Sequence, residues 1–387
     1  MPARTRPARV AGAAATLIAV ALVASACSSR SGGTAGGAGA GGTARTVEVA
    51  LTSDGCALPA PTLTAGPTTF HVTNAGASAV SEFEVKQGDR IVGEKENLAP
   101  GLDGSFSLSL EPGDYTAYCP GAGTESTPFT VTAASASPTS SSAMAADLAA
   151  ATTGYAAYVK DQAAQLVRAT TSFVGALTAG DLATAKQLYA PARVSYERIE
   201  PVAESFGDLD PQIDARAGDV PAASWGGFHR IEQILWTGGT TAGTAPYATK
   251  LLADVRRLDT LVQTATYQPA QLANGATELL DEIAKSKITG EEERYSHTDL
   301  VDFKANVDGS KQAFVLLVPA LTSVDAQLAQ TVAERFATVE SLLAQHREGD
   351  GFVPYTALTK DQVRSLAQAV DALAEPLSQV AGKVVVG

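Results

Sequence analysis

A histidine and a glutamate lie three residues apart within residues 225–236, which read Trp-Gly-Gly-Phe-His-Arg-Ile-Glu-Gln-Ile-Leu-Trp. Residues i and i+3 share one face of a helix, so His229 and Glu232 can point at the same spot. An imidazole beside a carboxylate suits first-row transition metals such as zinc, iron or copper better than calcium or magnesium. The same spacing also fits a core histidine beside a surface glutamate, so the rest of the chain has to decide.

Two other segments carry more polar residues than a plain helical bundle needs. In residues 196–211, Glu197, Glu200 and Glu204 are spaced three and four apart and would form one stripe of a helix. Most stripes of this kind are solvated acidic edges. Residues 295–306 read Tyr-Ser-His-Thr-Asp-Leu-Val-Asp-Phe-Lys-Ala-Asn, and their later polar side chains also fit a role in satisfying buried helix neighbours.

The elements that carry these segments are helices. From residue 144 to the C-terminus, apolar residues recur at intervals of three and four, as at Leu251, Val255, Leu258 and Val262. This period is typical of amphipathic helices, and no strand pattern accompanies it. The sequence therefore predicts an all-α domain at residues 144–387, large enough for two packed helical bundles.

The preceding part of the chain has a different period. Residues 46–132 alternate apolar and polar side chains, and turns rich in Gly, Pro and Asn interrupt them. Seven strands are expected, at residues 46–51, 68–73, 81–86, 90–94, 105–110, 114–119 and 128–132. Short strands at this density predict a β-sandwich, and the Ser-, Ala- and Pro-rich residues 133–143 predict a linker to the helices.

The N-terminus predicts export. Residues 1–26 combine three arginines, an apolar run and a small-residue processing site, as in a signal peptide. Cys27 follows directly, as in a bacterial lipobox, so we expect it to be lipidated and to anchor the protein in the cell membrane. Ala24 stands where Leu is commoner, and an ordinary secretory signal is the alternative. Residues 27–45 have the composition of a flexible tether.

The net charge excludes one class of function. Removal of the leader with its three arginines changes the formal net charge from −13 to about −16. Nucleic-acid binding needs a basic surface, so we do not expect it here. Acidity suits a protein that gathers cations, although solubility explains it equally well.

Cys56 and Cys119 are the two cysteines that remain beside Cys27. In an oxidising compartment such a pair is usually a disulfide. Residues 111–119, however, resemble the last hairpin of cupredoxins, where a Pro-Gly turn leads to a metal-binding cysteine. A blue-copper centre also needs two histidines and usually a methionine, and residues 120–128, directly after Cys119, contain neither. We therefore expect either a disulfide or a different metal site.

A second candidate site in the sandwich consists of carboxylates. Glu82 and Glu84 alternate with apolar residues, so they share the face of the strand opposite the core, and Glu94 and Glu96 are expected to do the same on the next strand. If the two strands form a hairpin around residues 87–89, four carboxylates gather. Like charges across strands are destabilising, so such a cluster indicates a bound cation or a solvated edge.

The three polar blocks of the helical part, taken in order, resemble the imelysin-like family. They are Tyr-Glu-Arg-Ile-Glu-Pro at residues 196–201, Gly-Phe-His-Arg-Ile-Glu at 227–232 and Tyr-Ser-His-Thr-Asp-Leu at 295–300. The hallmark of that family is His-x-x-Glu. The resemblance implies two four-helix bundles with a metal site between helices. The implied metal residues are His229 and Glu232, with Glu197, Glu200 and Asp210 as further candidates.

A cupredoxin-like domain followed by an imelysin-like domain resembles the EfeO family of extracytoplasmic iron-binding components. Their uptake system also contains a membrane iron permease and a haem peroxidase, which are the implied partners. The resemblance implies Fe²⁺ or Fe³⁺ as the bound ion, and two sites in the sandwich. One is a copper site of Cys56, Glu82 and Cys119, and the other is an iron site of Glu82, Glu84, Glu94 and Glu96.

The predicted function is iron capture and delivery, by coordination rather than by enzymatic turnover. A His-x-x-Glu metallopeptidase is one alternative, but Gln233 follows Glu232, so the second histidine of the usual zinc-peptidase motifs is missing. A set rich in carboxylates and poor in histidine fits a hard cation such as Fe³⁺ better than catalytic zinc. A surface polysaccharide-binding module is the other alternative, and the scarcity of aromatic residues in the helical part argues mildly against it.

Overall fold

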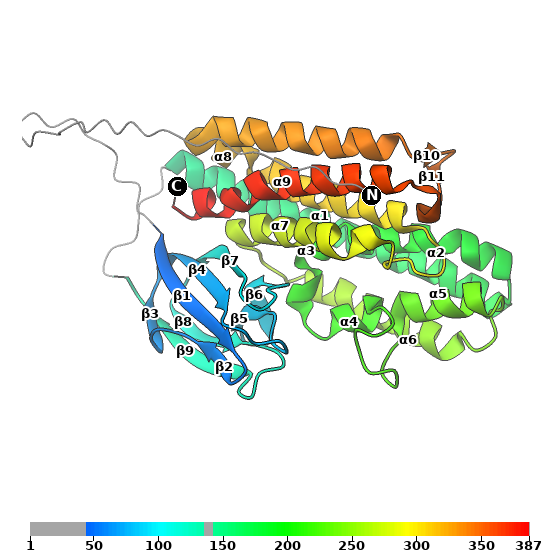
Figure 1. Ribbon diagram of the computed structural model, residues 1–387, viewed down its shortest axis with the longest axis horizontal. Coiled ribbons are helices and arrows are strands. Elements are labelled where there is room, and N and C mark those ends of the chain that lie inside the picture. The colour runs from blue at the N-terminus through cyan, green and yellow to red at the C-terminus, as the bar shows by residue number, and fades with distance from the viewer. Residues whose placement is uncertain (1–43, 135–141, 387) are drawn as a thin grey trace, which may run out of the picture. The chain divides into compact units, whose positions relative to one another are not determined.

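The computed structural model describes residues 44–134 and 142–386, and all of them belong to one compact unit. The predicted signal peptide and Cys27 lie outside the described residues. Within them, strands are followed by helices, as the two sequence periods predict (Figure 1).

The N-terminal part is a sandwich of two sheets, which confirms that prediction. In one sheet the order is β2(Gly55–Ala57), β1(Arg45–Thr52), β4(Gly66–Asn74) and β7(Asp103–Leu110). In the other it is β3(Thr62–Thr64), β9(Ser126–Thr132), β8(Gly113–Tyr118), β5(Phe83–Gln87) and β6(Arg90–Lys95). All seven expected strands are present. The sequence missed β2 and β3, because three residues are too few to show a period.

Alternation along the strands builds the core between the two sheets. Val47, Val49 and Leu51 of β1 are buried, while the residues between them are more exposed. Phe70 and Phe106 stack with ring centroids 5.2 Å apart. Burial of such side chains supplies most of the free energy that holds a sandwich together.

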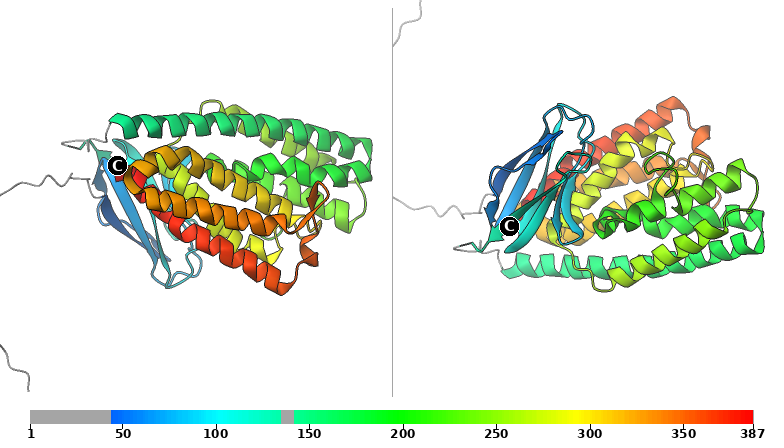
Figure 2. Two further views of the ribbon diagram at one scale, coloured as in Figure 1. Left: turned by 90° about the horizontal axis from the view of Figure 1, so that it is seen from above. Right: turned by 90° about the horizontal axis from the view of Figure 1, so that it is seen from below.

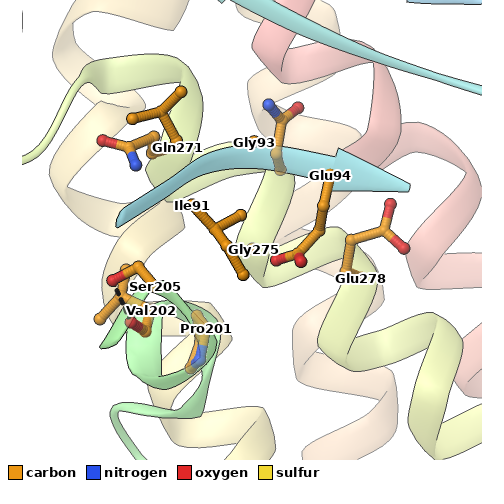
Figure 3. Close-up of a pocket in the computed structure, with 11 residues that line it drawn as sticks. Ile91, Gly93, Glu94, Pro201, Val202, Ser205, Gln271, Gly275 and Glu278 are labelled. Carbon is orange, nitrogen blue, oxygen red and sulfur yellow. Dashed lines mark hydrogen bonds between the residues drawn. The ribbon is translucent and has the colours of Figure 1, made fainter. Parts of the chain in front are cut away.

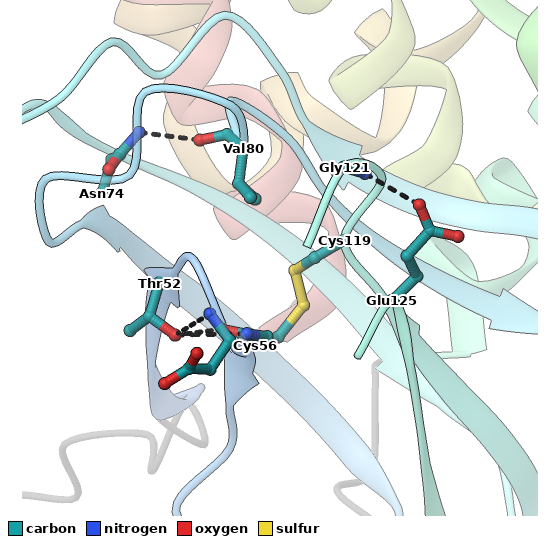
Figure 4. Close-up of a disulfide and its surroundings, with 9 residues drawn as sticks. Thr52, Cys56, Asn74, Val80, Cys119, Gly121 and Glu125 are labelled. Atoms are coloured by element: carbon teal, nitrogen blue, oxygen red, sulfur yellow. Dashed lines mark hydrogen bonds between the residues drawn. A yellow bond between two sulfur atoms is a disulfide. The ribbon is translucent and has the colours of Figure 1, made fainter. Parts of the chain in front are cut away.

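Cys56 and Cys119 form a disulfide between β2 and the residue after β8 (Figure 4), with Cα atoms 6.0 Å apart. The structure therefore shows the disulfide alternative. The expected copper site of Cys56, Glu82 and Cys119 is wrong, because sulfurs joined in a disulfide are not thiolate ligands. The bridge joins residues 63 apart. In the chain-entropy description, closing such a loop stabilises the fold by about 4 kcal/mol.

The C-terminal part is helical, which confirms the all-α prediction apart from a short hairpin of two strands with two residues each. Its elements are α1(Ser142–Ala179), α2(Leu182–Glu197), α3(Glu200–Ala203), η1(Glu204–Phe206), α4(Leu209–Asp214), α5(Gly227–Thr237), α6(Ala245–Val262), α7(Pro269–Lys285), η2(Lys287–Thr289), α8(Asp299–Ala344), β10(Arg347–Glu348), β11(Gly351–Phe352), η3(Tyr355–Ala357) and α9(Lys360–Val386). Helix α1 packs against α2, α6 and α8, while α7, α8 and α9 pack against one another (Figures 1 and 2). One continuous hydrophobic core joins these helices.

Helix α8 is long and apolar enough to cross a membrane, by length and composition alone. The element is interrupted at Asp325, whose φ of −154° and ψ of 78° are not helical, and its two halves pack against each other. Phe314 and Phe336, one from each half, are buried and stack. The helix also contacts α1, α7 and α9. We therefore interpret α8 as a core helix.

The glutamate stripe of residues 196–206 is not a single helix. Helix α2 ends at Glu197 and α3 begins at Glu200, so the predicted stripe is broken between them. Pro201 explains the break, because it has no amide hydrogen to donate to the carbonyl oxygen of Glu197, four residues earlier. The stripe prediction is wrong for this reason.

A glycine in α7 lets α3 approach closely. A Cβ at Gly275 would lie 1.8 Å from the carbonyl oxygen of Pro201. We expect Gly275→Ala to lower the free energy of unfolding by about 1–3 kcal/mol, because the helices would have to separate. Urea unfolding at constant m-value measures it. The control is Gly175→Ala in α1, where a Cβ meets nothing within 4 Å and alanine should be neutral or stabilising. Equal midpoints for the two variants would contradict the close approach.

Candidate metal centre

The start of α5 is held against the end of α4 by a glycine. Gly227 has φ +69°, and a Cβ there would lie 2.2 Å from the carbonyl oxygen of Ile213. Only a residue without a side chain fits both conditions. This close approach brings His229, two residues into α5, next to Asp214, the last residue of α4.

His229 is 2% exposed and is surrounded by carboxylates. Its Nε2 lies 3.6 Å from Asp214 Oδ1 and 3.5 Å from Glu292 Oε1. Its Nδ1 lies 3.6 Å from Glu232 Oε2 and 3.9 Å from Glu293 Oε1. Within the described part of the chain, neither ring nitrogen has a hydrogen-bond partner. Buried polar groups are normally hydrogen-bonded, so this arrangement indicates a place for a ligand.

The distances around Nε2 suit a metal ion. Two donor atoms that each lie about 2.1 Å from one ion are at most about 4.2 Å apart. The separations of 3.5 and 3.6 Å from Nε2 to the two carboxylates meet this condition. The donor atoms of Asp214, His229 and Glu292 all lie within 4.8 Å of one another, and so do those of His229, Glu232 and Glu293.

Glu232 is fixed in place by the backbone, on the same face of α5 as His229, as the i, i+3 spacing predicts. Its Oε1 accepts hydrogen bonds from the amides of Tyr295 at 2.9 Å and Ser296 at 2.6 Å. Burial opposes its charge, but His229 and these two amides outweigh burial and lower the pKa of Glu232. Its other oxygen lies 3.6 Å from Nδ1, so Glu232 places a fixed negative charge beside that nitrogen, while Nε2 is next to Asp214 and Glu292.

A buried arginine neutralises part of this cluster. Arg193 of α2 is fully buried, and its guanidinium lies 2.7 Å from Glu293, 3.3 Å from Asp302 and 3.5 Å from Glu292. It also contacts Glu197 and Asp214. Burial opposes the charge on Arg193, but these carboxylates outweigh burial and raise its pKa. Five carboxyl groups thus share this one guanidinium, and burial raises the pKa of two of them, Glu293 and Asp302, the latter to about 8.

Lys287 of η2 is a second buried cation, and it engages two of the residues predicted as metal ligands. Its Nζ lies 2.5 Å from Glu200 and 3.5 Å from Glu197, and Asn306 also donates to both glutamates. The structure therefore pairs Glu197 and Glu200 with protein donors and does not bring them into a ligand group with His229. Asp302 and Asn306, two of the later polar residues in the segment 295–306, do pair with buried neighbours, as expected: Asp302 with Arg193, and Asn306 with Glu197 and Glu200.

Asp210, the further predicted ligand, also lies outside the His229 groups. It accepts a hydrogen bond from the hydroxyl of Tyr196. Burial raises the pKa of Asp210 to about 6, although this hydrogen bond opposes the shift. Its side chain instead lines a cavity.

The cavity has a volume of about 300 Å³ and carries many carboxylates. They belong to Glu96, Glu200, Asp210, Asp214, Asp219, Glu282 and Glu292. Arg216 is the basic residue among the described residues that line it, and it pairs with Glu292 at 2.9 Å and Asp219 at 3.1 Å. Asp214 and Glu292 both line the cavity and flank Nε2, so these two carboxylates lie between His229 and the cavity.

Comparison with known proteins identifies the family of the chain. Residues 151–380 match the model of the imelysin family. The "Iron uptake system component EfeO" of Yersinia pseudotuberculosis (strain IP32953) is 41% identical over 340 residues, which cover 87% of this chain and 90% of that protein. The protein of the same name from Escherichia coli (strain K12) is 39% identical over 340 residues, with the same coverage. The chain belongs to the EfeO family. It is an EfeO-family protein with an imelysin domain, as its three polar blocks predict.

In this EfeO-family chain the carboxylates of the sandwich gather only in part. Strands β5 and β6 form the predicted hairpin, with Glu84 opposite Glu94. Donor atoms of Glu82, Glu94 and Glu96 lie within 4.8 Å of one another. Glu84 is excluded: it is 5% exposed, and Lys86 lies 3.5 Å from it. Burial and then the neighbouring glutamates raise the pKa values of Glu82 and Glu96.

Sequence reasoning missed the residues that complete the His229 groups in this EfeO-family protein. They are Asp214, Glu292 and Glu293. A run of three glutamates, residues 291–293, directly precedes the third polar block and was a usable signal. Nothing in the run tells which members are buried, and in the structure the first is exposed while the other two are buried.

Proposed function

We propose that this protein captures iron outside the cell and delivers it to a membrane permease. The observation that carries the proposal is the buried imidazole of His229, whose nitrogens have carboxylates at 3.5–3.9 Å and no hydrogen-bond partner among the described residues. The relatives named as iron uptake components support iron as the ion.

The ligand set in this proposal is Nε2 of His229 with one oxygen each from Asp214 and Glu292. This set faces the cavity, through which an ion can arrive. Glu232, predicted as a ligand, has in this proposal the role of a fixed negative charge 3.6 Å from Nδ1. Imidazole suits iron, and carboxylate oxygens suit hard cations, so both Fe²⁺ and Fe³⁺ fit this set.

Electrostatics favours cation uptake at this place. Arg193 and Lys287 together contact more carboxylates than they can neutralise. Buried like charges repel each other strongly because the surroundings are less polarisable than water. A bound cation relieves that repulsion, and this favours capture over binding of a neutral ligand such as a polysaccharide.

The remaining parts of the proposal concern location and partners. Lipid on Cys27 would anchor the protein to the outside of the cell membrane, with residues 27–45 as a tether. A membrane iron permease and a haem peroxidase of the same uptake system are the proposed partners. The cluster of Glu82, Glu94 and Glu96 is proposed as a second place for an iron ion.

Calorimetric titration of the purified protein tests the proposal, with Fe²⁺ under anoxic conditions, Fe³⁺ supplied as citrate, and Zn²⁺ in parallel. We expect tight iron binding that His229→Ala weakens by at least about 100-fold, since even loss of an outer hydrogen-bond partner of a metal ligand costs about 10–100-fold. The control is His71→Ala, which removes a histidine bonded to Glu48 and Asp103 in the sandwich. Binding of zinc alone would overturn the proposal and lead to peptidase assays.

A further inference from the structure

We propose that iron reaches His229 from the sandwich, through the acidic cavity, and that Glu96 is the residue that passes it across. The inference rests on the proposed function, because it assigns a loading route to the same site. The route consists of three groups of carboxylates in series. The first lies on the sandwich, the second in the cavity and the third beside His229.

Glu96 belongs to two of these groups. Its carboxylate is one of the three on the sandwich that gather within 4.8 Å, together with Glu82 and Glu94. It also lines the 300 Å³ cavity, where Asn97 is the other sandwich residue. An ion held by the sandwich cluster therefore already has one ligand on the wall of the cavity.

Carboxylates of the helical domain continue the route. Glu200 and Glu282 line the cavity with Glu96, and the same three residues line a smaller neighbouring pocket. Burial raises the pKa of Glu282 to about 7. The neighbouring Glu292 and Asp210 add to this shift, and Lys287 opposes it. These carboxyl groups line the same cavity from the two domains, so a cation between them would have oxygen ligands on both sides.

The route ends on a buried donor without a partner. Asp214 and Glu292 line the cavity and lie 3.6 and 3.5 Å from Nε2 of His229. His229 is 2% exposed, and within the described residues its nitrogens accept and donate no hydrogen bond. Acidic residues that lie only on a surface could be explained by solubility. A row of carboxylates that leads to a buried imidazole without a hydrogen bond indicates a path for a cation.

Contacts between the domains hold Glu96 in position. Lys95, its neighbour in the chain, is 7% exposed and lies 2.8 Å from Glu278 and 3.1 Å from Asp281 of α7. Asn274 of α7 donates a 2.8 Å hydrogen bond to the carbonyl oxygen of Ser107. Strand β6 thus lies against α7, and Glu94 and Glu278 line one small pocket between them (Figure 3). Transfer across this boundary needs an exchange of carboxylate ligands and no rearrangement of the domains.

Stopped-flow fluorescence tests the route. The two tryptophans of the chain, Trp225 and Trp236, flank the segment that contains His229, so their quenching by Fe²⁺ under anoxic conditions reports loading of that site. The full chain is mixed with Fe²⁺ as wild type, as Glu96→Gln and as Glu111→Gln. Glu111 is an exposed sandwich residue outside the cavity and serves as the matched control.

We expect Glu96→Gln to slow both association and dissociation of Fe²⁺ by about 10-fold or more, which is the lower end of the range for electrostatic guidance of ions. The dissociation constant should stay within about 3-fold of the wild-type value, because both rates change together. A residue on the path changes both rates together, whereas a ligand of the final site changes the equilibrium. Glu111→Gln should match wild type.

Unchanged rates in Glu96→Gln would overturn the route and show that ions enter the cavity directly from solvent. A weaker dissociation constant with an unchanged association rate would also overturn it, because Glu96 would then act in the final site. Failure of the proposed function looks different. In that case wild type would show no quenching that His229→Ala removes.

Discussion

Arg193→Met is expected to lower the free energy of unfolding by about 3–5 kcal/mol or more, which is the usual cost of removing one partner from a buried ion pair. Arg193 is fully buried, and its guanidinium contacts five carboxylates. Without it these groups would repel one another with no water to screen them. Methionine fills a similar volume, so the loss reports charge rather than a cavity.

Urea unfolding, followed by circular dichroism, measures this loss. Arg198→Met is the matched control, because Arg198 lies close by in the chain, has a side chain that is 32% exposed, and pairs with Asp308 at 3.5 Å. Exposed pairs contribute about 0–1 kcal/mol, so this control should unfold almost as wild type does. A loss below about 1 kcal/mol in Arg193→Met would show that the surrounding carboxylates are protonated in the folded protein.

Glu292→Gln is expected to weaken iron binding by about 100-fold, because it removes a charged oxygen from the ligand set itself. Loss of a hydrogen-bond partner that only supports a metal ligand costs about 10–100-fold, and loss of a ligand should reach the upper end of that range. Burial opposes ionisation of Glu292, but Lys287 and His229 outweigh burial and lower its pKa well below the usual range. The carboxylate is therefore charged at neutral pH and ready to bind a cation. The amide oxygen of glutamine is neutral and a weaker ligand.

The control for this variant is its neighbour. Glu291→Gln makes the same chemical change one residue earlier, at a side chain that is 57% exposed and pairs with Arg294. Calorimetric titration with Fe²⁺ should give wild-type affinity for Glu291→Gln. Equal affinity in Glu292→Gln would place the ion on the other side of His229, between Glu232 and Glu293.

The sequence by itself determined the architecture and one face of the site. Alternation with period two gave the sandwich strands, and spacing of three and four gave the helices, because each period follows from local backbone geometry. The i, i+3 spacing placed His229 and Glu232 together for the same reason. Gly227 is part of this local information, since it permits the turn at which α5 begins.

Only the tertiary structure decided which carboxylates surround His229. Asp214, Glu292 and Glu293 come from other segments and meet it through packing, which no local period describes. Glu197 and Glu200 have the right spacing for a stripe, but Pro201 breaks the helix, and Lys287 and Asn306 engage both side chains. A carboxylate pairs with whichever donor the fold brings nearest, so ligands and ion-pair partners look alike in a sequence. The choice between a disulfide and a metal site at Cys56 and Cys119 depended in the same way on two strands meeting in space.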